Sequence, residues 1–211
     1  MSEDYVLHYH SETCLIVDKP SGLLSVPGRG EDKQDCMVRR VMADFPDALI
    51  VHRLDMATSG LLLLARGKEA HRAYSLLFQE RQMHKRYEAV VAGVIAQDDG
   101  QIDLPMITDW PNRPKQKVDF EIGKPSLTHY RVLARDEVQA NTRVALFPHT
   151  GRSHQLRVHL QAIGHPILGD ALYADELALA RSPRLLLHAC ELAFTDPFSG
   201  ESLCIESPVP F

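Results

Sequence analysis

The sequence predicts an α+β fold in a single domain spanning residues 1–211. Many short apolar segments with strand character alternate with only a few amphipathic helical segments. No internal repeat, low-complexity tract or linker divides the chain, and a chain of this length can bury a substantial core. A sheet accompanied by a few helices is therefore expected.

The first part of the chain is expected to contain a strand, a loop and a helix. Thr13–Asp18 is predicted to be a short strand, because Lys19–Gly22 contains the proline and glycine of a turn. The polar segment Gly28–Asp35 is expected to be a mobile loop. Gln34–Asp44 is predicted to be a helix that ends before Pro46, since the residue before a proline disfavours helical geometry.

The next segments show the strongest periodicity. Leu61–Leu64 is apolar without alternation, which predicts a strand buried on both faces. Lys68–Met83 is predicted to be an amphipathic helix, because apolar residues recur at helical spacing at Ala70, Ala73, Tyr74, Leu77 and Phe78. A valine-rich strand is expected over Arg86–Ile95. Two prolines exclude regular structure over Trp110–Lys115.

A strand pair and a helix are expected in the middle of the second half. Leu127–Ala134 and Asn141–Pro148 are predicted to pair around the turn-prone residues Arg135–Glu137. Ser153 is the predicted N-cap of a helix that Gly164 ends.

The last forty residues are expected to form a second short helix and a hairpin. The helix is predicted over Asp175–Ala180. The strands Arg184–Phe194 and Ser202–Ser207 are expected to pair through the turn Asp196–Gly200, which contains proline and glycine.

The composition is that of an ordinary globular protein without a membrane span. Hydrophobic residues make up 45% and charged residues 24% of the chain, and no apolar run reaches the roughly 20 residues of a membrane helix. The N-terminal segment Met1–Tyr5 is polar and acidic rather than a secretory signal, which predicts a cytoplasmic location. The cysteines form no Cys-x-x-Cys pair, so reduced thiols are expected.

Charge is distributed unevenly, although its total argues mildly against a nucleic-acid partner. The formal net charge is -5, whereas many RNA-binding proteins are basic. Screening limits surface electrostatics to about 8 Å at physiological salt, so local clusters matter more than the total. Basic residues gather in the segments 66–72, 81–86 and 113–117. This pattern fits a basic groove on an acidic body, or two solvated faces without a partner.

One polar turn is a candidate for chemistry. The sequence His52-Arg53-Leu54-Asp55 leads through a few further residues into the apolar strand that begins near Leu61. Catalytic side chains are commonly carried by loops that a rigid element supports. The alternative is that Asp55 only caps the turn and that Arg53 is an ordinary surface charge.

Five motifs in the same order resemble the RluA family of pseudouridine synthases. They are the His52–Asp55 turn together with Asp18–Leu24, Lys85–Tyr87, Thr150–His159 and Gly164–Asp170. The resemblance covers nearly the whole chain and implies the pseudouridine synthase catalytic fold, a central mixed or antiparallel β-sheet with flanking helices and loops. It also implies a bare catalytic domain without the S4 domain that many family members carry.

The resemblance implies catalytic roles for three residues. Pseudouridine formation is an isomerisation that breaks the N1–C1′ bond of a uridine and rejoins the uracil through C5. Asp55 matches the family's catalytic aspartate, which either attacks C1′ or removes the C2′ proton. Arg157 matches the arginine paired with that aspartate, which a guanidinium can orient through two parallel hydrogen bonds. Tyr87 matches the tyrosine placed against the target uracil, with Leu156 on the other side of the pocket.

The turn is also expected to bind substrate. A uridine must leave its stack to reach the carboxylate, at a cost of a few kcal/mol. Arg53 matches the arginine that lies near the flipped nucleotide and meets phosphate. His52 is expected to support this turn of the substrate site rather than to act as an acid or base. If Arg157 is not paired with Asp55, it binds only phosphate or lies on an exposed helix face.

A basic segment indicates the substrates. Asp109–Val118, together with Gly123–Pro125, resembles a branch of the family that modifies both an anticodon-loop uridine of tRNA and a hairpin-loop uridine of 23S rRNA. Arg113, Lys115 and Lys117 alternate within the segment and are expected to face one phosphate track. We therefore predict a dual-specificity enzyme.

No cofactor or metal is expected, because the isomerisation needs no redox or nucleotide cofactor. The histidines in the second half lack the i, i+4 spacing of helical metal pairs; they are His149, His154, His159 and His165. The expected partner is RNA, without a membrane, and the protein is expected to be a monomer. The alternatives are a synthase for a single rRNA or tRNA target, a non-catalytic RNA-binding module on the same fold, and a metal-dependent RNA hydrolase, which would need clustered ligands.

Overall fold

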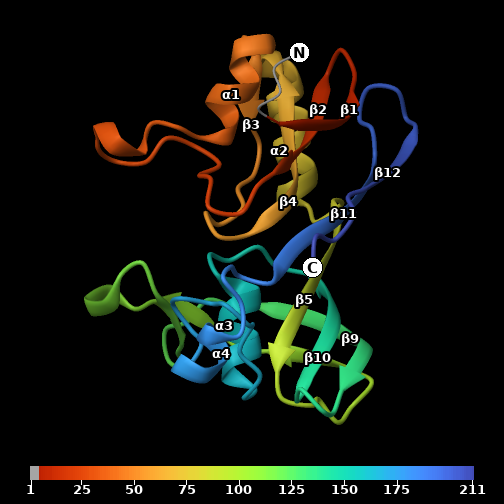
Figure 1. Ribbon diagram of the computed structural model, residues 1–211. Helices are drawn as coiled ribbons and strands as arrows, with labels where there is room; N and C mark the ends of the chain where they lie inside the picture. The colour runs from red at the N-terminus through yellow and green to blue at the C-terminus, as the bar shows by residue number, and fades with distance from the viewer. Residues whose placement is uncertain (1–4) are drawn as a thin grey trace. The chain divides into compact units, whose positions relative to one another are not determined.

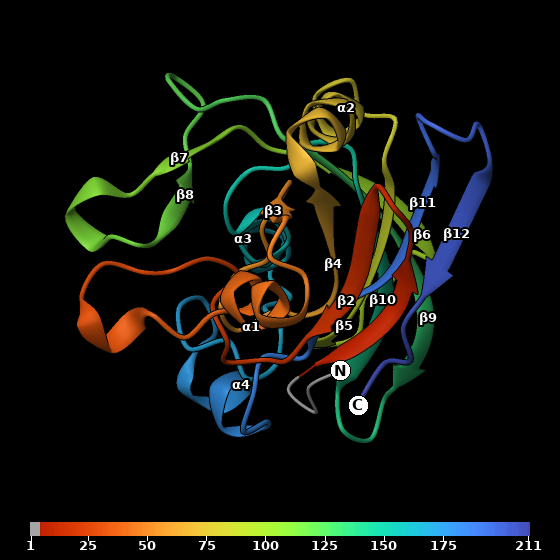
Figure 2. The same cartoon turned by 90° about the horizontal axis from the view of Figure 1, so that it is seen from above.

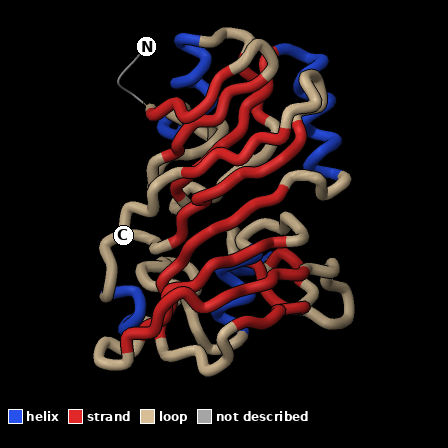
Figure 3. Tube along the Cα trace, turned by 90° about the vertical axis from the view of Figure 1, so that its right-hand side faces the viewer, coloured by secondary structure: helices blue, strands red, loops and turns tan. Residues whose placement is uncertain are grey.

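The computed structural model describes residues 5–211, which group into two compact units (Figure 1). Unit 1 runs to Lys85 and includes His188–Pro210, and unit 2 comprises Arg86–Leu187 with Phe211. In both units the helices are few and short beside the strands (Figure 3), which confirms the predicted α+β class. That residues 1–211 form a single domain stays a prediction. No helix in residues 5–211 is long and apolar enough to cross a membrane.

Unit 1 contains a mixed sheet. Its strands are β1 Val6–His10, β2 Cys14–Lys19, β3 Ala48–Ile50, β4 Ser59–Arg66, β11 Leu187–Thr195 and β12 Ser202–Glu206. They lie in the order β1, β2, β4, β11, with β3 beside β4 and β12 beside β11. β4 pairs antiparallel with β2 but parallel with β11, so the sheet is mixed. The helices of this unit are α1 Met37–Asp44, α2 Gly67–Gln79 and the 3₁₀ turn η1 Glu31–Lys33.

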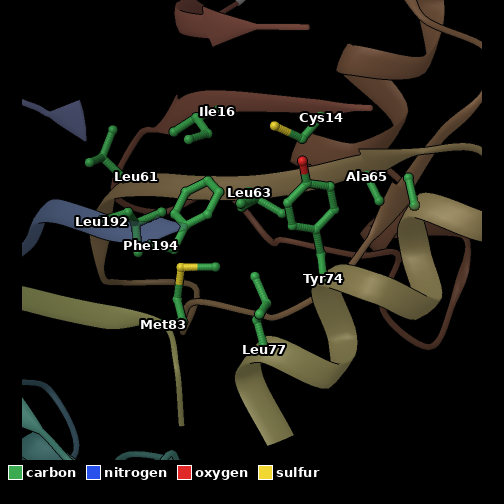
Figure 4. Close-up of a cluster of buried hydrophobic side chains, with 11 residues drawn as sticks. Cys14, Ile16, Leu61, Leu63, Ala65, Tyr74, Leu77, Met83, Leu192 and Phe194 are labelled. Carbon is green, nitrogen blue, oxygen red and sulfur yellow. The ribbon is translucent and has the colours of Figure 1, made fainter. Parts of the chain in front are cut away.

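The core of unit 1 forms where α2 covers β4. Figure 4 shows Tyr74 and Leu77 of α2 directed toward side chains of β2, β4 and β11. Leu61–Leu64 have no exposed surface, which confirms the predicted burial of this strand on both faces. Complete burial of each leucine contributes about 1.5–3 kcal/mol, so β4 is a rigid support for the turn that precedes it.

Unit 2 is built on antiparallel strands. They lie in the order β5, β10, β9, β6, and a separate two-stranded sheet joins β7 and β8. The bounds are β5 His84–Ala92, β6 Asp99–Asp103, β7 Met106–Thr108, β8 Gln116–Val118, β9 Leu127–Asp136 and β10 Asn141–Pro148. The helices are α3 Gln155–Ala162, α4 Glu176–Ala180 and the 3₁₀ turn η2 Trp110–Asn112. In Figure 2 the β7–β8 hairpin lies away from β9 and β10.

Two predicted helices are shorter than expected. α1 begins at Met37 instead of Gln34, because Cys36 is extended (φ -162°) and the Gln34 side chain bonds to loop carbonyls. α2 ends at Gln79 instead of Met83, since Arg81 takes a left-handed conformation (φ 61°). Such a conformation ends a helix, and few residues other than glycine adopt it.

Two local predictions about helix starts are wrong. Ser153 is not the N-cap of α3, because the helix begins at Gln155 after a left-handed His154 (φ 57°). Trp110–Asn112 forms a 3₁₀ turn although regular structure was excluded there. A proline in the first turn of a helix is tolerated, since its missing N–H would have no partner in that turn.

Candidate active site

The Asp55 turn of unit 1 connects β3 to β4 and is anchored on both sides of the aspartate. The Ser25 hydroxyl donates to the Leu54 carbonyl (2.8 Å) and accepts from the Leu54 amide (3.1 Å). The Thr58 amide donates to the Asp55 carbonyl (3.1 Å). Asp55 itself is partly buried, whereas Arg53 is exposed. These bonds therefore hold the backbone on both sides of the aspartate in place.

Lys19, the last residue of β2, stabilises the Asp55 turn through hydrogen bonds. Its side chain is completely buried, and its ammonium group donates to the carbonyls of Pro20 (2.9 Å), Leu23 (2.7 Å) and Met56 (3.1 Å). A buried charge is tolerated only when it is hydrogen-bonded in this way. Lys19 thus joins the Asp18–Leu24 motif to the residue that follows Asp55. Sequence reasoning did not single out this lysine as a positioning residue.

His52 is part of the same support. Its Nε2 accepts a hydrogen bond from the Leu63 amide (3.0 Å), and its ring stacks on Phe78 with 4.4 Å between centroids. Burial, and secondarily the positive charge of Lys85, lowers the pKa of His52 from 6.5 to about 3. The ring is therefore neutral near pH 7. This geometry favours a supporting role over acid–base chemistry.

A series of hydrogen bonds between polar side chains begins at Ser59, the first residue of β4. The Ser59 hydroxyl is hydrogen-bonded to His188 Nδ1 (2.8 Å), and His188 Nε2 to the Ser207 hydroxyl (3.0 Å). Ser207 donates in turn to Asp18 (2.5 Å). Such satisfied networks in a low-dielectric interior hold their members in one arrangement. The strand that follows the Asp55 turn is thereby tied to β2 and β11.

In unit 2, Arg157 of α3 forms a buried ion pair with Asp170. Its Nε donates to Oδ2 (2.8 Å) and its Nη2 to Oδ1 (2.7 Å). The side chains are 5% and 0% exposed. Asp170 also accepts from the amides of Leu172 (2.9 Å) and Tyr173 (3.2 Å). The bidentate contact sets both the plane and the direction of the guanidinium.

Tyr173 adds a second constraint on Arg157. The Arg157 Cζ lies 5.0 Å from the centroid of the Tyr173 ring. The Tyr173 hydroxyl is hydrogen-bonded to His154 Nδ1 (2.7 Å) and accepts from the Gln116 amide of β8 (2.8 Å). Neither Asp170 nor Tyr173 was predicted as a site residue. The Gly164–Asp170 motif was the available signal, because it places an acid near α3 in the sequence.

The remaining candidates of unit 2 lie on α3 and β5. Leu156 is buried in α3, and Tyr87 is a partly buried residue of β5 opposite Leu146 of β10. The adjacent Gln155 is also buried, and its amide nitrogen donates to Leu127 (3.0 Å) and Thr128 (3.0 Å) of β9. Gln155 therefore ties the first turn of α3 to the sheet.

The predicted phosphate-binding residues belong to the β7–β8 hairpin. Arg113 and Lys117 are exposed, and Lys115 is partly buried. The Arg113 guanidinium lies 4.0 Å from the centroid of the Trp110 ring. Lys117 pairs with Asp119 at 3.5 Å. Their common track along RNA stays a prediction.

The predicted catalytic residues divide between the units. Asp55 belongs to unit 1, whereas Tyr87 and Arg157 belong to unit 2. The pairing of Asp55 with Arg157 therefore stays a prediction. Within residues 5–211, no group of three or more His, Cys, Asp or Glu side chains is arranged to hold a metal ion.

The amino-acid sequence is similar to those of RNA pseudouridine synthases over nearly its full length. A family model described as RNA pseudouridylate synthase matches residues 13–162. A Yersinia pestis protein named dual-specificity RNA pseudouridine synthase RluA is 52% identical over 206 residues, 98% of this chain and 100% of that protein. A Vibrio parahaemolyticus protein of the same name is 54% identical over 206 residues, 96% of this chain and 82% of that protein.

Solved structures of this kind share the fold. Human RNA pseudouridylate synthase domain containing 1 has a TM-score of 0.82 at 30% identity, covering 99% of this chain and 85% of its own. Human RNA pseudouridylate synthase domain containing 4 has a TM-score of 0.77 at 26% identity, covering 97% and 88%. The predicted fold is thereby confirmed.

Proposed function

Because this chain belongs to the RNA pseudouridylate synthase family, we propose that it isomerises loop uridines to pseudouridine in both tRNA and 23S rRNA. The proposal of two RNA substrates is supported by the similarity, over nearly the full chain, to enzymes named dual-specificity RNA pseudouridine synthases. In the tRNA the substrate is an anticodon-loop uridine, and in the rRNA a hairpin-loop uridine. The protein acts as a monomer in the cytoplasm.

The reaction needs a carboxylate at the sugar of an everted uridine. The N1–C1′ bond breaks, the uracil turns, and a C5–C1′ bond forms; the C5 proton leaves and N1 gains a proton. Atoms and electrons balance without an oxidant, a reductant or a cofactor. Asp55 supplies the carboxylate, either as the nucleophile at C1′ or as the base that removes the C2′ proton. The anchored turn supports this role, because catalysis requires a fixed approach to the sugar.

Arg157 orients Asp55 in this proposal. A guanidinium has five N–H donors, and the bidentate contact with Asp170 uses two of them. The fixed plane of Arg157 supports the assignment, since a guanidinium already held by one acid presents a defined edge to another.

Tyr87 and Leu156 form the two sides of the uracil pocket in this proposal, and Arg53 lies near the everted nucleotide and meets phosphate. The exposure of Arg53 supports its role, because a side chain that enters RNA must reach beyond the protein surface. Eversion is less costly from a loop than from a duplex, which favours loop uridines.

Tritium release tests the function directly. Transcripts of the tRNA anticodon stem-loop and of the 23S rRNA hairpin carry tritium at uridine C5, and metal is omitted. The native protein is expected to release tritium from both, and Asp55→Asn to release none while still binding RNA. The exposed Asp32→Asn is the matched control and is expected to retain release.

The outcomes separate the alternatives. Release from only one RNA indicates a synthase for a single target. RNA binding without release by the native protein indicates a non-catalytic binding module. Equal release by the native protein and Asp55→Asn would remove the aspartate from the mechanism.

A further inference from the structure

The hairpin of unit 2 exposes large apolar side chains beside its basic residues. We name residues 105–124 the arm; it contains β7, η2 and β8 (Figure 2). Trp110 is 67%, Phe120 77% and Ile122 70% exposed. Single exposed apolar residues are common on proteins, but three within thirteen sequence positions of one hairpin call for an explanation.

The exposure is built into an ordered arm. The Asp119 side chain accepts from the amides of Glu121 (3.1 Å) and Ile122 (3.1 Å), which fixes the turn that carries Phe120. At the other end of the hairpin, the Asp109 amide donates to the Lys115 carbonyl (2.9 Å). The aromatic rings are thus presented by a hydrogen-bonded backbone.

Trp110 combines one cation–π contact with a large exposed surface. The Arg113 guanidinium lies over its ring at 4.0 Å from the centroid, while the residue is 67% exposed. A nucleobase stacked on the accessible surface would complete a sandwich of guanidinium, indole and base. Stacking on aromatic side chains and cation–π contacts from arginine are the two recurring contacts to unpaired nucleic acid.

The charge of the arm indicates which partner its apolar residues meet. Residues 113–117 carry three cations, Arg113, Lys115 and Lys117, and no acid. The acids of the arm lie outside this stretch: Asp109 precedes Trp110, and Asp119 and Glu121 flank Phe120. A phosphate backbone is attracted to the three cations of residues 113–117, one of which lies over the Trp110 ring.

We propose that the arm binds unpaired RNA bases by stacking, with Trp110 backed by Arg113 as the main platform and Phe120 as a second. The inference rests on the proposed function, because the RNA that it binds is the substrate whose loop presents unpaired bases. Arg113, Lys115 and Lys117 hold the backbone, and the rings distinguish an open loop from a duplex. The arm is therefore a specificity element outside the catalytic residues.

Trp110 is the only tryptophan of the chain, so its fluorescence reports on this position alone. The native protein is titrated with an anticodon stem-loop RNA and with a fully paired RNA of equal length. The stem-loop is expected to quench the emission in proportion to binding, and the duplex to leave it unchanged. Stem-loop binding without quenching, or equal quenching by the duplex, would overturn the proposal.

Variants separate stacking from charge. Trp110→Ala is expected to weaken stem-loop binding about tenfold and Trp110→Phe to restore part of it, with the loss falling on KM rather than kcat. Phe120→Ala is expected to weaken it less. Leu177→Ala, which also removes an exposed apolar side chain of unit 2, is the matched control and is expected to bind as the native protein does.

The test is independent of turnover. Quenching without tritium release from any RNA would refute the proposed function and leave the stacking contact standing. Tritium release without quenching, with Trp110→Ala binding normally, would refute the stacking contact alone.

Discussion

The guanidinium of Arg157 and the carboxylate of Asp170 are desolvated together, which makes their contact unlike the ion pairs on the surface. At the surface, Arg135 and Asp98 also lie 2.7 Å apart, but Asp98 is 84% exposed. A buried pair whose second member is lost leaves an uncompensated charge in a low-dielectric interior. The two ion pairs therefore contribute very different amounts to the free energy of unfolding, although their N–O distances are equal.

We expect Asp170→Asn to lower the free energy of unfolding by about 3–5 kcal/mol, and Asp98→Asn by less than about 1 kcal/mol. Denaturant unfolding of both variants measures the difference. Under conditions where Asp170→Asn is folded, its kcat is expected to fall, because Arg157 loses the acid that orients it. Equal stability of the two variants would show that the buried contact is not the anchor of Arg157.

His52 makes the free energy of unfolding of the protein depend on pH. Its pKa is about 3 in the folded protein and 6.5 in the unfolded chain. Above pH 6.5 both states are neutral, so the contribution of the ring is fully present. Below it, only the unfolded chain takes up the proton, and stability falls by up to about 1.4 kcal/mol per pH unit until pH approaches 3.

We therefore expect the native protein to lose more stability between pH 6 and pH 4 than His52→Asn does. The unfolding free energy measured across this range gives the two slopes. The exposed His84→Asn is the control and is expected to keep the native slope. Parallel curves for native protein and His52→Asn would show that the ring is protonated in the folded state.

At the scale of elements, the position of β4 sets the position of the Asp55 turn that precedes it. Gly60 pairs with Ala189 of β11 and has a φ of +113°. A Cβ at this position would lie 2.3 Å from the Ala189 carbonyl oxygen. Gly67 also has a positive φ (+78°), but a Cβ there would meet nothing within 4 Å.

The two glycines therefore form a matched pair. We expect Gly67→Ala to cost about 1–2 kcal/mol for the backbone conformation, and Gly60→Ala to cost a further 1–3 kcal/mol, roughly, for the clash. Thermal or denaturant unfolding compares them. Gly60→Ala is also expected to reduce tritium release, since the clash moves the strand that supports Asp55. Equal destabilisation of the two variants would contradict the close approach of the strands.

Elements were predictable where the local pattern was long. The predicted strand Thr13–Asp18 corresponds to β2, and the C-terminal hairpin is formed by β11 and β12 as expected. The short strands β1, β3, β6, β7 and β8 were not predicted. Strands of three to five residues carry little periodicity, and of these only β12 was predicted, because the proline and glycine of the turn Asp196–Gly200 precede it.

At the scale of the whole molecule, the charge pattern matters more than the net charge. The formal charge is -5, yet the arm carries three cations within five residues. Binding of RNA by these cations releases counterions, so affinity falls as salt rises. The arm can thus attract RNA on a protein that is acidic overall.

The salt dependence of RNA binding tests this contribution. For single-stranded RNA, the slope of log affinity against log salt is about -0.7 per neutralised phosphate. Replacing Arg113, Lys115 and Lys117 by glutamine is expected to make the slope less steep by about 2. Arg135→Gln is the control, because Arg135 lies outside the arm, on β9, and is held by Asp98 and by the Ile95 carbonyl. An unchanged slope in the triple variant would exclude the arm from phosphate contact.

Local sequence was sufficient for the α+β class, for the buried strand Leu61–Leu64 and for the family motif around Asp55, because short-range periodicity and residue order encode them. Only the tertiary structure showed that Lys19 fastens the Asp55 turn and that Asp170 holds Arg157. A buried charge is tolerated only through partners that folding brings to it, and those partners are set by three-dimensional packing. Spacing along the chain does not reveal them.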